Sequence, residues 1–462
     1  MGENVTNIIL YHSLIVFGEL LIFISLVHML YKRRTPASMT AWLLSMVLMP
    51  YLFVVLYFIF GSRKHIEKYK KNNIEPKEDI KNPSILNPTD EIIRSCGGFT
   101  LRKDQEFKLF TNPIEAYRVF MDSIQGAKKS IYISTYVLKL DKTGKSIMDA
   151  LAKKAKSGVD VKILVDSIGS WRLYFDQHKL KGYRDNGVAI GFFMPALKMP
   201  FRNYINLRNH RKIYLFDDSF VLSGGMNIAD EYLGADEQKE RWEDMLFLSK
   251  GRSVMDFFEV FASDWFYASS KYIEFKNQDL LDGGDTHLQV VPSGPDMQKD
   301  ALYEALLCAI YEAKKRIWII SPYFVPNDSL SQALIVSAHK GVDVKIITPK
   351  NSNHITADLT RSSFMRDLED EGVEIWLYEG VMLHAKAILF DEDAVMLGSV
   401  NFDNRSLFLN YDIATFVYSK RVIKDTFSWM RGLLENSQQG TKKASSIRII
   451  SENFMRIFAP VM

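Results

Sequence analysis

Two long apolar stretches open the chain. The first, residues 8–31, contains a single carboxylate, Glu19, and the second, residues 35–62, contains no charged side chain. As helices that rise about 1.5 Å per residue, both are long enough to cross a hydrocarbon layer of about 30 Å. Pro50 interrupts the second stretch and indicates a kink or a re-entrant path there. The pattern predicts a membrane anchor in residues 1–65, made of two hydrophobic helices.

Basic residues flank these stretches. Three lie in the short connection between them: Lys32, Arg33 and Arg34. Five more follow the second stretch within nine residues: Arg63, Lys64, Lys68, Lys70 and Lys71. Because basic residues concentrate on the cytoplasmic side of membrane proteins, the larger cluster predicts a cytoplasmic location for the rest of the chain. The same cluster suits an anionic membrane surface, and a solvated flank explains it equally well.

The rest of the chain repeats itself. Ala-Lys-Lys-Ser-Ile at 127–131 recurs as Ala-Lys-Lys-Arg-Ile at 313–317, and Gly-Val-Asp-Val-Lys at 158–162 recurs unchanged at 341–345. In each copy a helix leads into an apolar strand, and a second helix and strand follow. Strands that alternate with helices of this length indicate an α/β fold with the sheet inside, present twice.

The repeat also suggests the domain organisation. Residues 66–105 are polar and interrupted by prolines, and we interpret them as a linker. A first domain is expected at 106–283 and a second at 284–462, with the boundary at the Gly283-Gly284-Asp285 turn. A chain of 462 residues exceeds one ordinary core, which agrees with a duplicated unit.

Composition mainly excludes other classes of protein. The chain has 58 Lys and Arg against 55 Asp and Glu, a net charge of +3, which argues against a nucleic-acid-binding protein. Its two cysteines, Cys96 and Cys308, give neither a disulfide framework nor a metal-binding C-x2-C spacing. Both are best interpreted as small apolar side chains. Nothing in the sequence indicates a cofactor.

One reactive pattern appears in both copies. Residues 210–217 and 384–391 both read H-x-K-x4-D. A turn of small residues and an asparagine follow each motif, and the spacing from histidine to asparagine is 17 residues both times. The paired positions are His210 and His384, Lys212 and Lys386, Asp217 and Asp391, Gly225 and Ser399, and Asn227 and Asn401. Two histidines in matching contexts indicate a catalytic pair.

These residue types suit phosphodiester exchange at a site without a metal. A neutral imidazole can attack phosphorus, and a second, protonated imidazole can give its proton to the leaving alkoxide. The two lysines would hold the phosphoryl oxygens, while Asn227, Asn401 and the Ser399 hydroxyl would donate hydrogen bonds to them. Gly225 and the neighbouring glycines would allow close backbone approach. We favour His210 as the nucleophile, although the symmetry of the motif does not decide the order.

Carboxylates complete the predicted site. Each histidine needs its second ring nitrogen held, and Asp244, 34 residues after His210, and Asp412, 28 residues after His384, are the candidates. Asp217 and Asp391 complete the motif and count among the catalytic candidates, although seven positions from the histidine suit a turn or a lysine contact better. The apolar residues after each lysine predict a strand on which His and Lys share one face.

With these residues in place, the chain resembles the phospholipase D superfamily and, within it, the bacterial cardiolipin synthases. The signature H-x-K-x4-D-x6-G-[GS]-x-N is matched by residues 210–227 and again by 384–401. The flanking segments 224–233 and 401–406 and the Arg33-to-Ser38 connection in the anchor resemble that subfamily as well. One departure is Asp412, where the family more often has Glu.

The resemblance implies two tandem phospholipase D-like α/β/α domains with pseudo-twofold symmetry, following the pair of transmembrane helices. It implies a phosphatidyltransferase of the bacterial inner membrane that converts two phosphatidylglycerol molecules into cardiolipin and glycerol through a phosphohistidine. The alternatives are a phospholipase D-type hydrolase, a transferase that makes another phospholipid, and a catalytically inactive membrane scaffold. The oligomeric state is not indicated. Tyr136 and Tyr323, in matching strands, would line a lipid groove or pack in the core.

Overall fold

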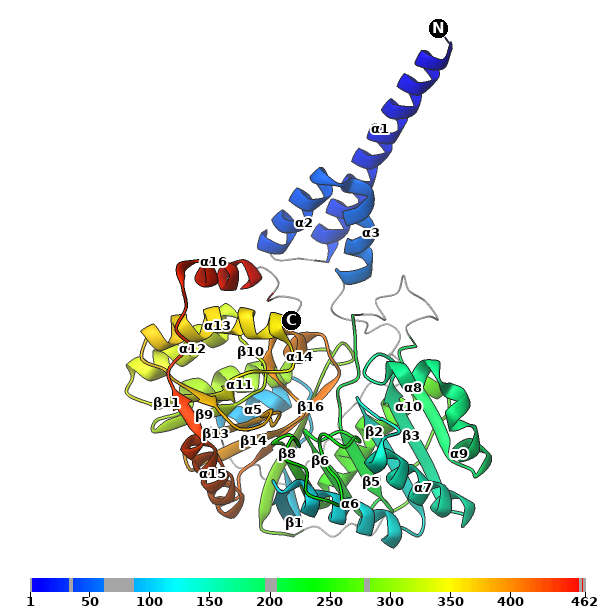
Figure 1. Cartoon of the computed structure of the whole chain (residues 1–462), viewed down its shortest axis with the longest axis vertical. Coiled ribbons are helices and arrows are strands. Elements are labelled where there is room, and N and C mark those ends of the chain that lie inside the picture. The colour runs from blue at the N-terminus through cyan, green and yellow to red at the C-terminus, as the bar shows by residue number, and fades with distance from the viewer. Residues whose placement is uncertain are drawn as a thin grey trace. The chain divides into compact units, whose positions relative to one another are not determined.

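The computed structural model describes residues 2–32, 36–61, 87–195, 206–277, 283–456 and 459. These residues form two compact units, an N-terminal helical unit and a larger catalytic unit. The predicted basic connection at 33–35, the basic flank and most of the linker at 62–86, and part of the C-terminal tail lie outside the described residues. The two units are described separately (Figure 1).

The N-terminal unit contains one long helix and two short ones. Helix α1 runs over Gly2–Tyr31, α2 over Pro36–Leu48 and α3 over Pro50–Phe60. Within α1, the 26 residues Thr6–Tyr31 are long and apolar enough to cross a membrane, and no other helix of the described residues meets that measure. Most apolar side chains of α1 are exposed, which suits a lipid environment rather than a soluble core.

The second apolar stretch of the anchor forms two short helices, with the break at Pro50, where the sequence indicated a kink or a re-entrant path. Helix α2 ends at Leu48, Met49 takes an extended conformation, and Pro50 begins α3 as its first residue. Because proline has no amide hydrogen and fixes its φ, it starts a helix more readily than it continues one. A small apolar cluster holds the three helices together: Met29, Met46, Val54 and Tyr57. The Tyr57 hydroxyl lies 2.7 Å from Nδ1 of His28.

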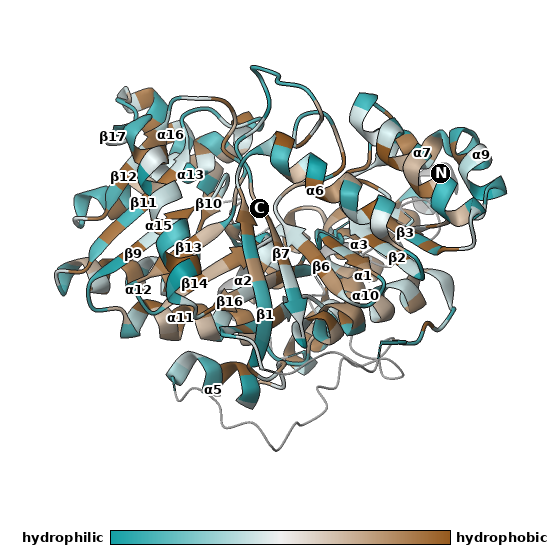
Figure 2. Ribbon diagram, turned by 90° about the horizontal axis from the view of Figure 1, so that it is seen from below, coloured by the Kyte–Doolittle hydropathy of each residue, from teal (hydrophilic) through white to brown (hydrophobic). Residues whose placement is uncertain are grey.

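A single 15-stranded sheet runs through the catalytic unit. Its strand order is β17-β12-β11-β9-β13-β14-β16-β8-β1-β7-β6-β5-β2-β3-β4. Strands of the second repeat occupy one half and strands of the first repeat the other. The first strand of each repeat, β1 (Arg102–Phe110) and β8 (Thr286–Ser293), pair antiparallel in the middle, Arg102 opposite Leu288. Figure 2 shows β1 between β16 of the second repeat and β7 of the first. The expected duplication therefore closes into one continuous sheet around a pseudo-twofold axis.

Each repeat contributes the same elements. The first comprises α6 (Pro113–Gly126), β2 (Ser130–Thr135), α7 (Lys142–Lys156), β3 (Asp160–Asp166), β4 (Ala189–Phe193), β5 (Ile213–Phe216), β6 (Phe220–Gly224), β7 (Leu246–Gly251) and α10 (Ser253–Ser269). The second comprises α11 (Ala301–Glu312), β9 (Arg316–Ile320), α12 (Asp328–His339), β11 (Asp343–Pro349), α13 (Ile355–Asp370), β12 (Glu374–Tyr378), β13 (Ala387–Phe390), β14 (Ala394–Gly398), β16 (Asp412–Val417) and α15 (Lys420–Glu435). The two helices and two apolar strands predicted for each copy are confirmed.

Short elements complete each repeat. In the first, α8 (Trp171–Phe175), a 3-10 turn (Gln177–Leu180) and α9 (Lys181–Asp185) follow β3. In the second, β10 (Phe324–Val325) pairs with β15 (Phe402–Asp403), which leads into α14 (Asn404–Phe408). The edge strand β17 (Ser437–Gln439) and the helix α16 (Ser446–Met455) end the described chain.

Helices cover both faces of the sheet, as alternate side chains of the strands show. In β2, Ile131 and Ile133 belong to the core shared with α6 and α7, whereas Tyr132 stacks on Phe261 of α10 on the opposite face. In β9, Ile317 and Ile319 pack with α11 and α12, whereas Trp318 packs on Phe427 of α15. The two halves therefore have the same three-layer α/β/α arrangement.

Part of the predicted linker is built into this fold. Helix α5 (Pro88–Ser95) starts at Pro88, with the Asn87 side chain accepting from the Asp90 amide, and packs Ile93 and Cys96 into the core of the second repeat. Strand β1 then begins at Arg102, inside the range taken as linker. A proline suggests an interruption of structure, but at the first position of a capped helix it is favourable.

Candidate active site

The two H-x-K segments lie beside each other where the repeats meet. Residues 210–212 precede β5 rather than belonging to it, because the ladder of β5 begins at Ile213. The amide of His210 donates to the carbonyl of Tyr411 (2.8 Å), and the amide of Tyr411 donates to the carbonyl of Arg208 (2.8 Å). The segment is extended, as expected, but it pairs with the opposite repeat instead of with its own sheet.

The second segment is held in the same way. Strand β13 begins at Ala387, after the motif lysine, so residues 384–386 also stand outside the ladder. The amide of His384 donates to the carbonyl of Glu243 (2.7 Å), and the amide of Glu243 donates to the carbonyl of Met382 (2.9 Å). Each motif therefore pairs with the residue that precedes the orienting carboxylate of the other repeat.

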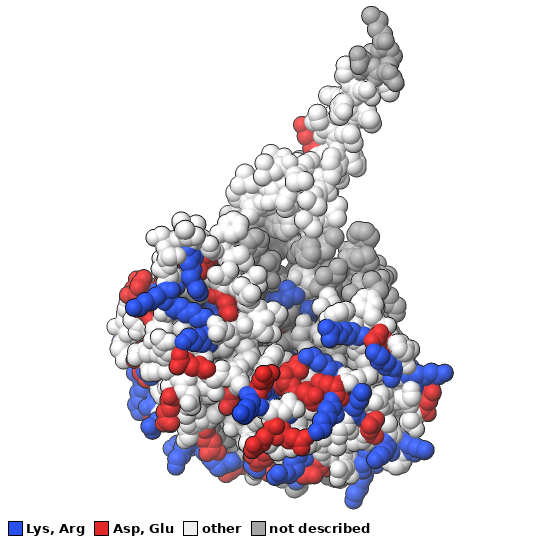
Figure 3. All heavy atoms as spheres, viewed as in Figure 1, with Lys and Arg blue, Asp and Glu red and all other residues white. Residues whose placement is uncertain are grey.

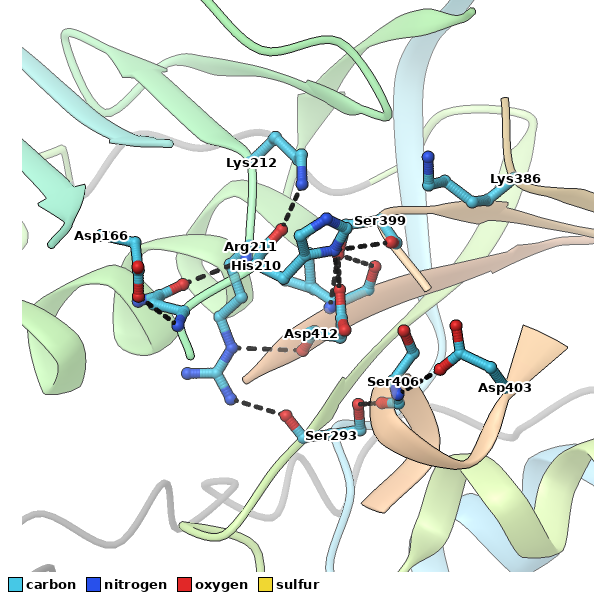
Figure 4. A network of polar contacts seen from close by, with 12 residues as sticks. Asp166, His210, Arg211, Lys212, Ser293, Lys386, Ser399, Asp403, Ser406 and Asp412 are labelled. Carbon is cyan, nitrogen blue, oxygen red and sulfur yellow. Dashed lines mark hydrogen bonds and ion pairs between the residues drawn. The ribbon is translucent and has the colours of Figure 1, made fainter. Parts of the chain in front are cut away.

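As a result of this pairing, each motif histidine contacts the aspartate of the opposite repeat. Nδ1 of His210 lies 2.9 Å from Oδ1 of Asp412 (Figure 4), and Nδ1 of His384 lies 2.7 Å from Oδ2 of Asp244. All four side chains are buried, and both aspartates are fully enclosed. With each Nδ1–H donated to a carboxylate, Nε2 is left as the basic nitrogen of each ring, and in His384 this atom lies 3.1 Å from Nζ of Lys386. Asp244 and Asp412 therefore contact the histidines as predicted, each across the repeat boundary.

The two carboxylates are supported differently. The Ser399 hydroxyl donates to Oδ1 of Asp412 (2.5 Å), and the Ser399 carbonyl lies 3.1 Å from Nδ1 of His210. At the equivalent position a Cβ on Gly225 would lie 2.0 Å from Oδ1 of Asp244, so only glycine leaves room for that carboxylate. Ser399 therefore supports Asp412, and Gly225 leaves room for Asp244, whereas the sequence suggested a phosphate contact for Ser399 and close backbone approach at Gly225.

The glycines before them close the same turns. Gly224 has a φ of +144°, and a Cβ there would lie 2.5 Å from the carbonyl oxygen of Met245. Gly398 has a φ of +157°, and its Cβ would lie 2.3 Å from the carbonyl oxygen of Ile413. Side chains other than hydrogen are strained in this backbone region and have no space here. The small-residue turn therefore brings each strand end against the strand that carries the aspartate.

The two lysines are buried beneath the histidines. Nζ of Lys212 donates to the carbonyl of His210 (2.7 Å), and Nζ of Lys386 donates to the carbonyl of His384 and lies 2.9 Å from its Nδ1. Burial lowers the pKa of Lys386 to about 8, partly offset by the nearby aspartates. Burial and the charge of Lys386 also hold the pKa of Lys212 well below its usual range. Two amines in one enclosed space oppose each other's protonation, and an anionic ligand would favour the protonated form of both.

Both imidazoles are neutral in the unliganded site. Burial, with the charge of Lys212, lowers the pKa of His210 to about 4, although Asp412 opposes the shift. Burial and Lys386 lower the pKa of His384 to about 3 against the opposing effect of Asp244. For Asp244, burial acts to raise the pKa, but the contacts with His384, Lys386 and the Met245 amide outweigh it and lower the pKa. A neutral imidazole with a free Nε2 is the form that attacks phosphorus.

Both motif asparagines line the same cavity. Oδ1 of Asn227 accepts from the Val137 amide (3.1 Å), while its Nδ2 is buried and has no hydrogen-bond partner within the described chain. Oδ1 of Asn401 is likewise buried and unpaired among the described residues. The two ends of an amide exchange places by a flip of the side chain. A phosphate oxygen in the cavity would give the unpaired donor of Asn227 a partner.

Asp217 and Asp391 lie away from this chemistry. Asp217 accepts the backbone amides of Lys128, Lys129 and Ser130 at 2.6–3.0 Å, where β2 begins. Asp391 accepts the equivalent amides of residues 314–316 at 2.7–2.8 Å before β9. Both have a positive φ, 55° and 51°. These contacts correspond to the turn-holding role that their spacing suggested.

A buried arginine ties the first motif to the core. Arg211, between His210 and Lys212, points to the opposite side and pairs with Asp264 (2.8 Å) and Asp296 (3.0 Å). Its Nε also donates to the carbonyl of Asp412 (3.1 Å), and Nη2 donates to the carbonyl of Ser293 (Figure 4). The alternation of His, Arg and Lys between two faces is that of an extended segment, as predicted.

The site opens into a cavity of about 610 Å³ between the two repeats. The first repeat lines it with Tyr136, Val137, Lys139, Gly169, Arg208, His210, Asn227, Glu231, Tyr232 and Trp242. The second lines it with Tyr323, Val325, Asn353, His354, Thr356, Ala357, His384, Asn401, Asp403, Arg405, Ser406 and Asn410. Since both histidines face one cavity of this size, a single substrate phosphate can lie between them.

Several lining residues were not singled out by the motif. Tyr136 lies edge-on to the His210 ring (5.0 Å between centroids), and Tyr232 and Trp242 flank the His384 ring at 5.2 and 5.3 Å. Arg208 and Arg405 add two guanidinium groups to the wall. Matching positions in the repeats pointed to Tyr136 and Tyr323, and both line the cavity. Arg208 stands two residues before His210, whereas nothing local in the sequence marks Trp242.

No group of three or more His, Cys, Asp and Glu side chains within the described ranges is arranged to hold a metal ion. Besides the two motif histidines, the basic and acidic side chains that line the cavity include Lys139, Arg208, Glu231, Asp403 and Arg405.

Known proteins share this architecture. The family described as cardiolipin synthase, PLD-like domain, matches residues 120–265 and 306–434. Cardiolipin synthase 1 of Bacillus cereus is 31% identical over 93% of this chain and 90% of its own length. Cardiolipin synthase of Clostridium perfringens strain SM101 is 32% identical over 93% of this chain and 95% of its own. The crystal structure of phosphatidylserine synthase from Haemophilus influenzae Rd KW20 covers 81% of this chain and 98% of its own, with a TM-score of 0.62 and 16% identity.

That structural likeness shows the fold, while the two matched regions and the near full-length relatives show the family. The chain therefore belongs to the cardiolipin synthase family of phosphatidyltransferases with phospholipase D-like domains.

Proposed function

We propose that the protein transfers the phosphatidyl group of one phosphatidylglycerol molecule to the free primary hydroxyl of a second one, giving cardiolipin and glycerol. The observation that carries this proposal is the crossed arrangement of the site. Two neutral imidazoles from two repeats, each held by a carboxylate of the other repeat, face one cavity. The near full-length relatives named cardiolipin synthase supply the substrate class.

In the first step the donor phosphate lies between the two histidines. Nε2 of His210 attacks phosphorus and forms an N–P bond while the P–O bond to the glycerol headgroup breaks. The anionic phosphodiester favours protonation of the second imidazole, and Nε2–H of His384 gives that proton to the departing glycerol oxygen. The products of this step are free glycerol and a phosphatidyl group on His210.

In the second step the acceptor replaces glycerol. His384, now neutral, takes the proton of the acceptor hydroxyl, whose oxygen attacks phosphorus as the N–P bond breaks. Cardiolipin leaves, and His210 returns to its neutral form. Locating the phosphate of a trapped intermediate by peptide mapping tests the assignment, and phosphate on His384 would reverse the two roles.

The polar groups around phosphorus serve both steps. Lys212 and Lys386 donate to the histidine carbonyls in the unliganded site, and on binding they would turn to the phosphoryl oxygens. Asn227 and Asn401 would donate to the same oxygens. Asp244 and Asp412 stabilise whichever imidazole is protonated, because a charged ring donates a stronger Nδ1 hydrogen bond. Ser399 and Gly225 keep those carboxylates in position.

The proposed substrates place the enzyme at a membrane. Helix α1 would span the bilayer, and the second apolar segment would cross it or lie partly within it. The basic clusters of the sequence favour a cytoplasmic catalytic unit and contact with anionic lipid in the inner membrane of a bacterium. Cleavage of the catalytic unit by protease added outside intact cells would contradict that orientation.

The first experiment is a product assay with the purified full-length protein in phosphatidylglycerol micelles containing a chelator. We expect equal amounts of cardiolipin and free glycerol. Phosphatidate alone would indicate a hydrolase, and no turnover with lipid still bound would favour a non-catalytic scaffold. His210→Ala and His384→Ala should each abolish the reaction. His339→Ala, at an exposed surface histidine, is the matched control and should not change it.

A further inference from the structure

Helix α16 presents apolar side chains to solvent. Ile447 and Ile450, three positions apart, are 79% and 68% exposed. The opposite side of the helix packs on α13, with Glu452 fully buried against Arg366 (2.9 Å) and Asn453 accepting from the Ser363 hydroxyl (2.8 Å). The orientation of α16 is thus fixed by polar contacts on the inside, which leaves a hydrophobic stripe outside.

This stripe continues to the mouth of the catalytic cavity. Helix α13, which carries α16, begins at Ile355, which is 79% exposed, while its neighbours His354 and Thr356 line the cavity. Exposed isoleucines therefore stand both at the cavity rim of the second repeat and on α16.

The first repeat has its own exposed apolar pair at the equivalent place. Helix α8 follows β3 as α13 follows β11, and its Trp171 and Phe175 are 54% and 61% exposed. Gly169, two residues before α8, lines the cavity. Helices α8, α13 and α16 lie toward the same end of the catalytic unit (Figure 1). Large apolar side chains therefore stand on both sides of the cavity mouth.

Positive charge accompanies the stripe. Residues 441–456 contain four basic side chains, Lys442, Lys443, Arg448 and Arg456, and one acidic side chain, Glu452, for a net charge of +3. Glu452 is already neutralised by Arg366 and Arg448. Figure 3 shows basic side chains below the uncharged outer surface at α16. An apolar stripe above a basic flank matches a bilayer, in which acyl chains lie beneath anionic headgroups.

We propose that α16, Ile355 and the α8 pair Trp171 and Phe175 form an interfacial surface that inserts into an anionic bilayer and holds the cavity mouth against the lipid headgroups. The inference rests on the proposed function in that only a lipid substrate requires the cavity to open onto a membrane. A second protein seated on the same side chains would cover the mouth from both sides, whereas a bilayer delivers substrate there. A second copy of the chain is therefore disfavoured as the occupant.

The activity test uses the full-length protein in vesicles of phosphatidylcholine with about 30% phosphatidylglycerol. The variant Ile447→Ser/Ile450→Ser should lower the initial rate on vesicles about tenfold, because part of the inserted apolar area is lost. Its rate on a water-soluble, short-chain phosphatidylglycerol below the micelle concentration should stay unchanged. Tyr311→Ser removes an exposed aromatic side chain from α11, outside the interfacial surface, and should change neither rate. Equal losses on both substrates, or no loss on either, would overturn the inference.

A second measurement does not depend on turnover. In a variant without Cys96 and Cys308, a fluorophore attached to Ile450→Cys should be quenched by lipids that carry a quencher in the acyl chain. The same fluorophore on Tyr311→Cys should not be quenched. Absence of quenching at position 450 would overturn the interfacial surface even if cardiolipin is made. Quenching without any cardiolipin would instead retain the surface and contradict the proposed function.

Discussion

Nδ1 of His210 lies 2.9 Å from Oδ1 of Asp412, a carboxylate 202 residues away in the other repeat. The reciprocal contact joins His384 to Asp244, 140 residues away, at 2.7 Å. Neither repeat therefore contains a complete histidine–carboxylate pair of its own. Both pairs cross the same boundary, so the site exists only when the repeats are assembled. The two motifs therefore form one active centre.

The crossed pairs predict which step of the reaction each aspartate supports. Asp412→Asn and Asp244→Asn keep the size of the side chain but remove the charge that fixes the Nδ1–H tautomer, so each should lower kcat on the order of 10²–10⁴-fold. If the roles are as proposed, Asp412→Asn should reduce phosphoenzyme formation on His210, and Asp244→Asn should reduce proton transfer by His384. Single-turnover glycerol release and cardiolipin formation, measured separately, distinguish these effects. Activity retained in either variant would contradict the pairing.

Gly225 and Ser399 occupy equivalent positions with different tolerance to change. A Cβ on Gly225 would lie 2.0 Å from Asp244, so Gly225→Ala should displace the carboxylate and lower kcat at least about tenfold. Ser399→Ala only removes one hydrogen bond to Asp412 and should lower kcat several-fold at most, since the His210 contact persists. For both variants, kcat is measured together with KM for phosphatidylglycerol. A larger effect from Ser399→Ala would show that the hydroxyl contacts substrate instead.

Asp391 and Asp217 should affect stability rather than chemistry. Asp391→Ala leaves three backbone amides without their acceptor and should destabilise the catalytic unit by about 2–4 kcal/mol. We expect a lower Tm in thermal unfolding, with kcat preserved at a temperature where the variant is folded. Asp217→Ala should behave alike. A fully folded but inactive variant would assign these carboxylates to the reaction.

The sequence predicts most of the layers and the residues that gather at the centre. Alternating strands and helices and a repeated motif suffice, because both signals are local and recur in order. The crossed carboxylates could not be assigned to their histidines, since distance along the chain places Asp244 nearer to His210. The backbone pairing of each motif with the segment before the aspartate of the other repeat determines which residues meet.

Other differences also come from long-range contacts or from proline. Polar composition around Pro88 suggested a linker, yet Asn87 caps a helix there that packs on the second repeat. The isolated apolar segment after residue 35 suggested one helix, but Pro50 starts a new one. Ser399 was expected on the phosphate because its hydroxyl is a good donor, but the nearer acceptor is Asp412. In each case the local residue type is compatible with two roles and the tertiary neighbour selects one.

The buried histidines predict a decrease in stability in mild acid. Their pKa values in the folded chain are about 4 and about 3. Below about pH 6.5 the two histidines are therefore protonated in the unfolded chain while they remain neutral in the folded chain. Stability should therefore fall as the pH drops from about 6.5 toward about 4, by about 1–3 kcal/mol per histidine. Thermal unfolding across this range checks it. His210→Gln and His384→Gln should each flatten the dependence, and an unchanged slope in both would contradict it.

Arg405 and Glu231 place opposite charges at equivalent positions of the two repeats. They stand four residues after Asn401 and Asn227, at equivalent positions, and both line the cavity. Glu231 forms an ion pair with Lys139, so its charge is already compensated.

Removing the positive charge of Arg405 should weaken the binding of an anionic lipid, whereas removing the negative charge of Glu231 should not weaken it. Arg405→Gln removes a cation from the wall and should raise KM for phosphatidylglycerol about tenfold, with a smaller change in kcat. Glu231→Gln releases Lys139 and should leave KM unchanged or lower it. Each variant removes one unit of charge, positive in one case and negative in the other, at matching places in the fold. Each is therefore a control for the other. Equal increases in KM, or a loss of kcat at constant KM in Arg405→Gln, would mean that the arginine supports the fold or the chemistry rather than the lipid charge.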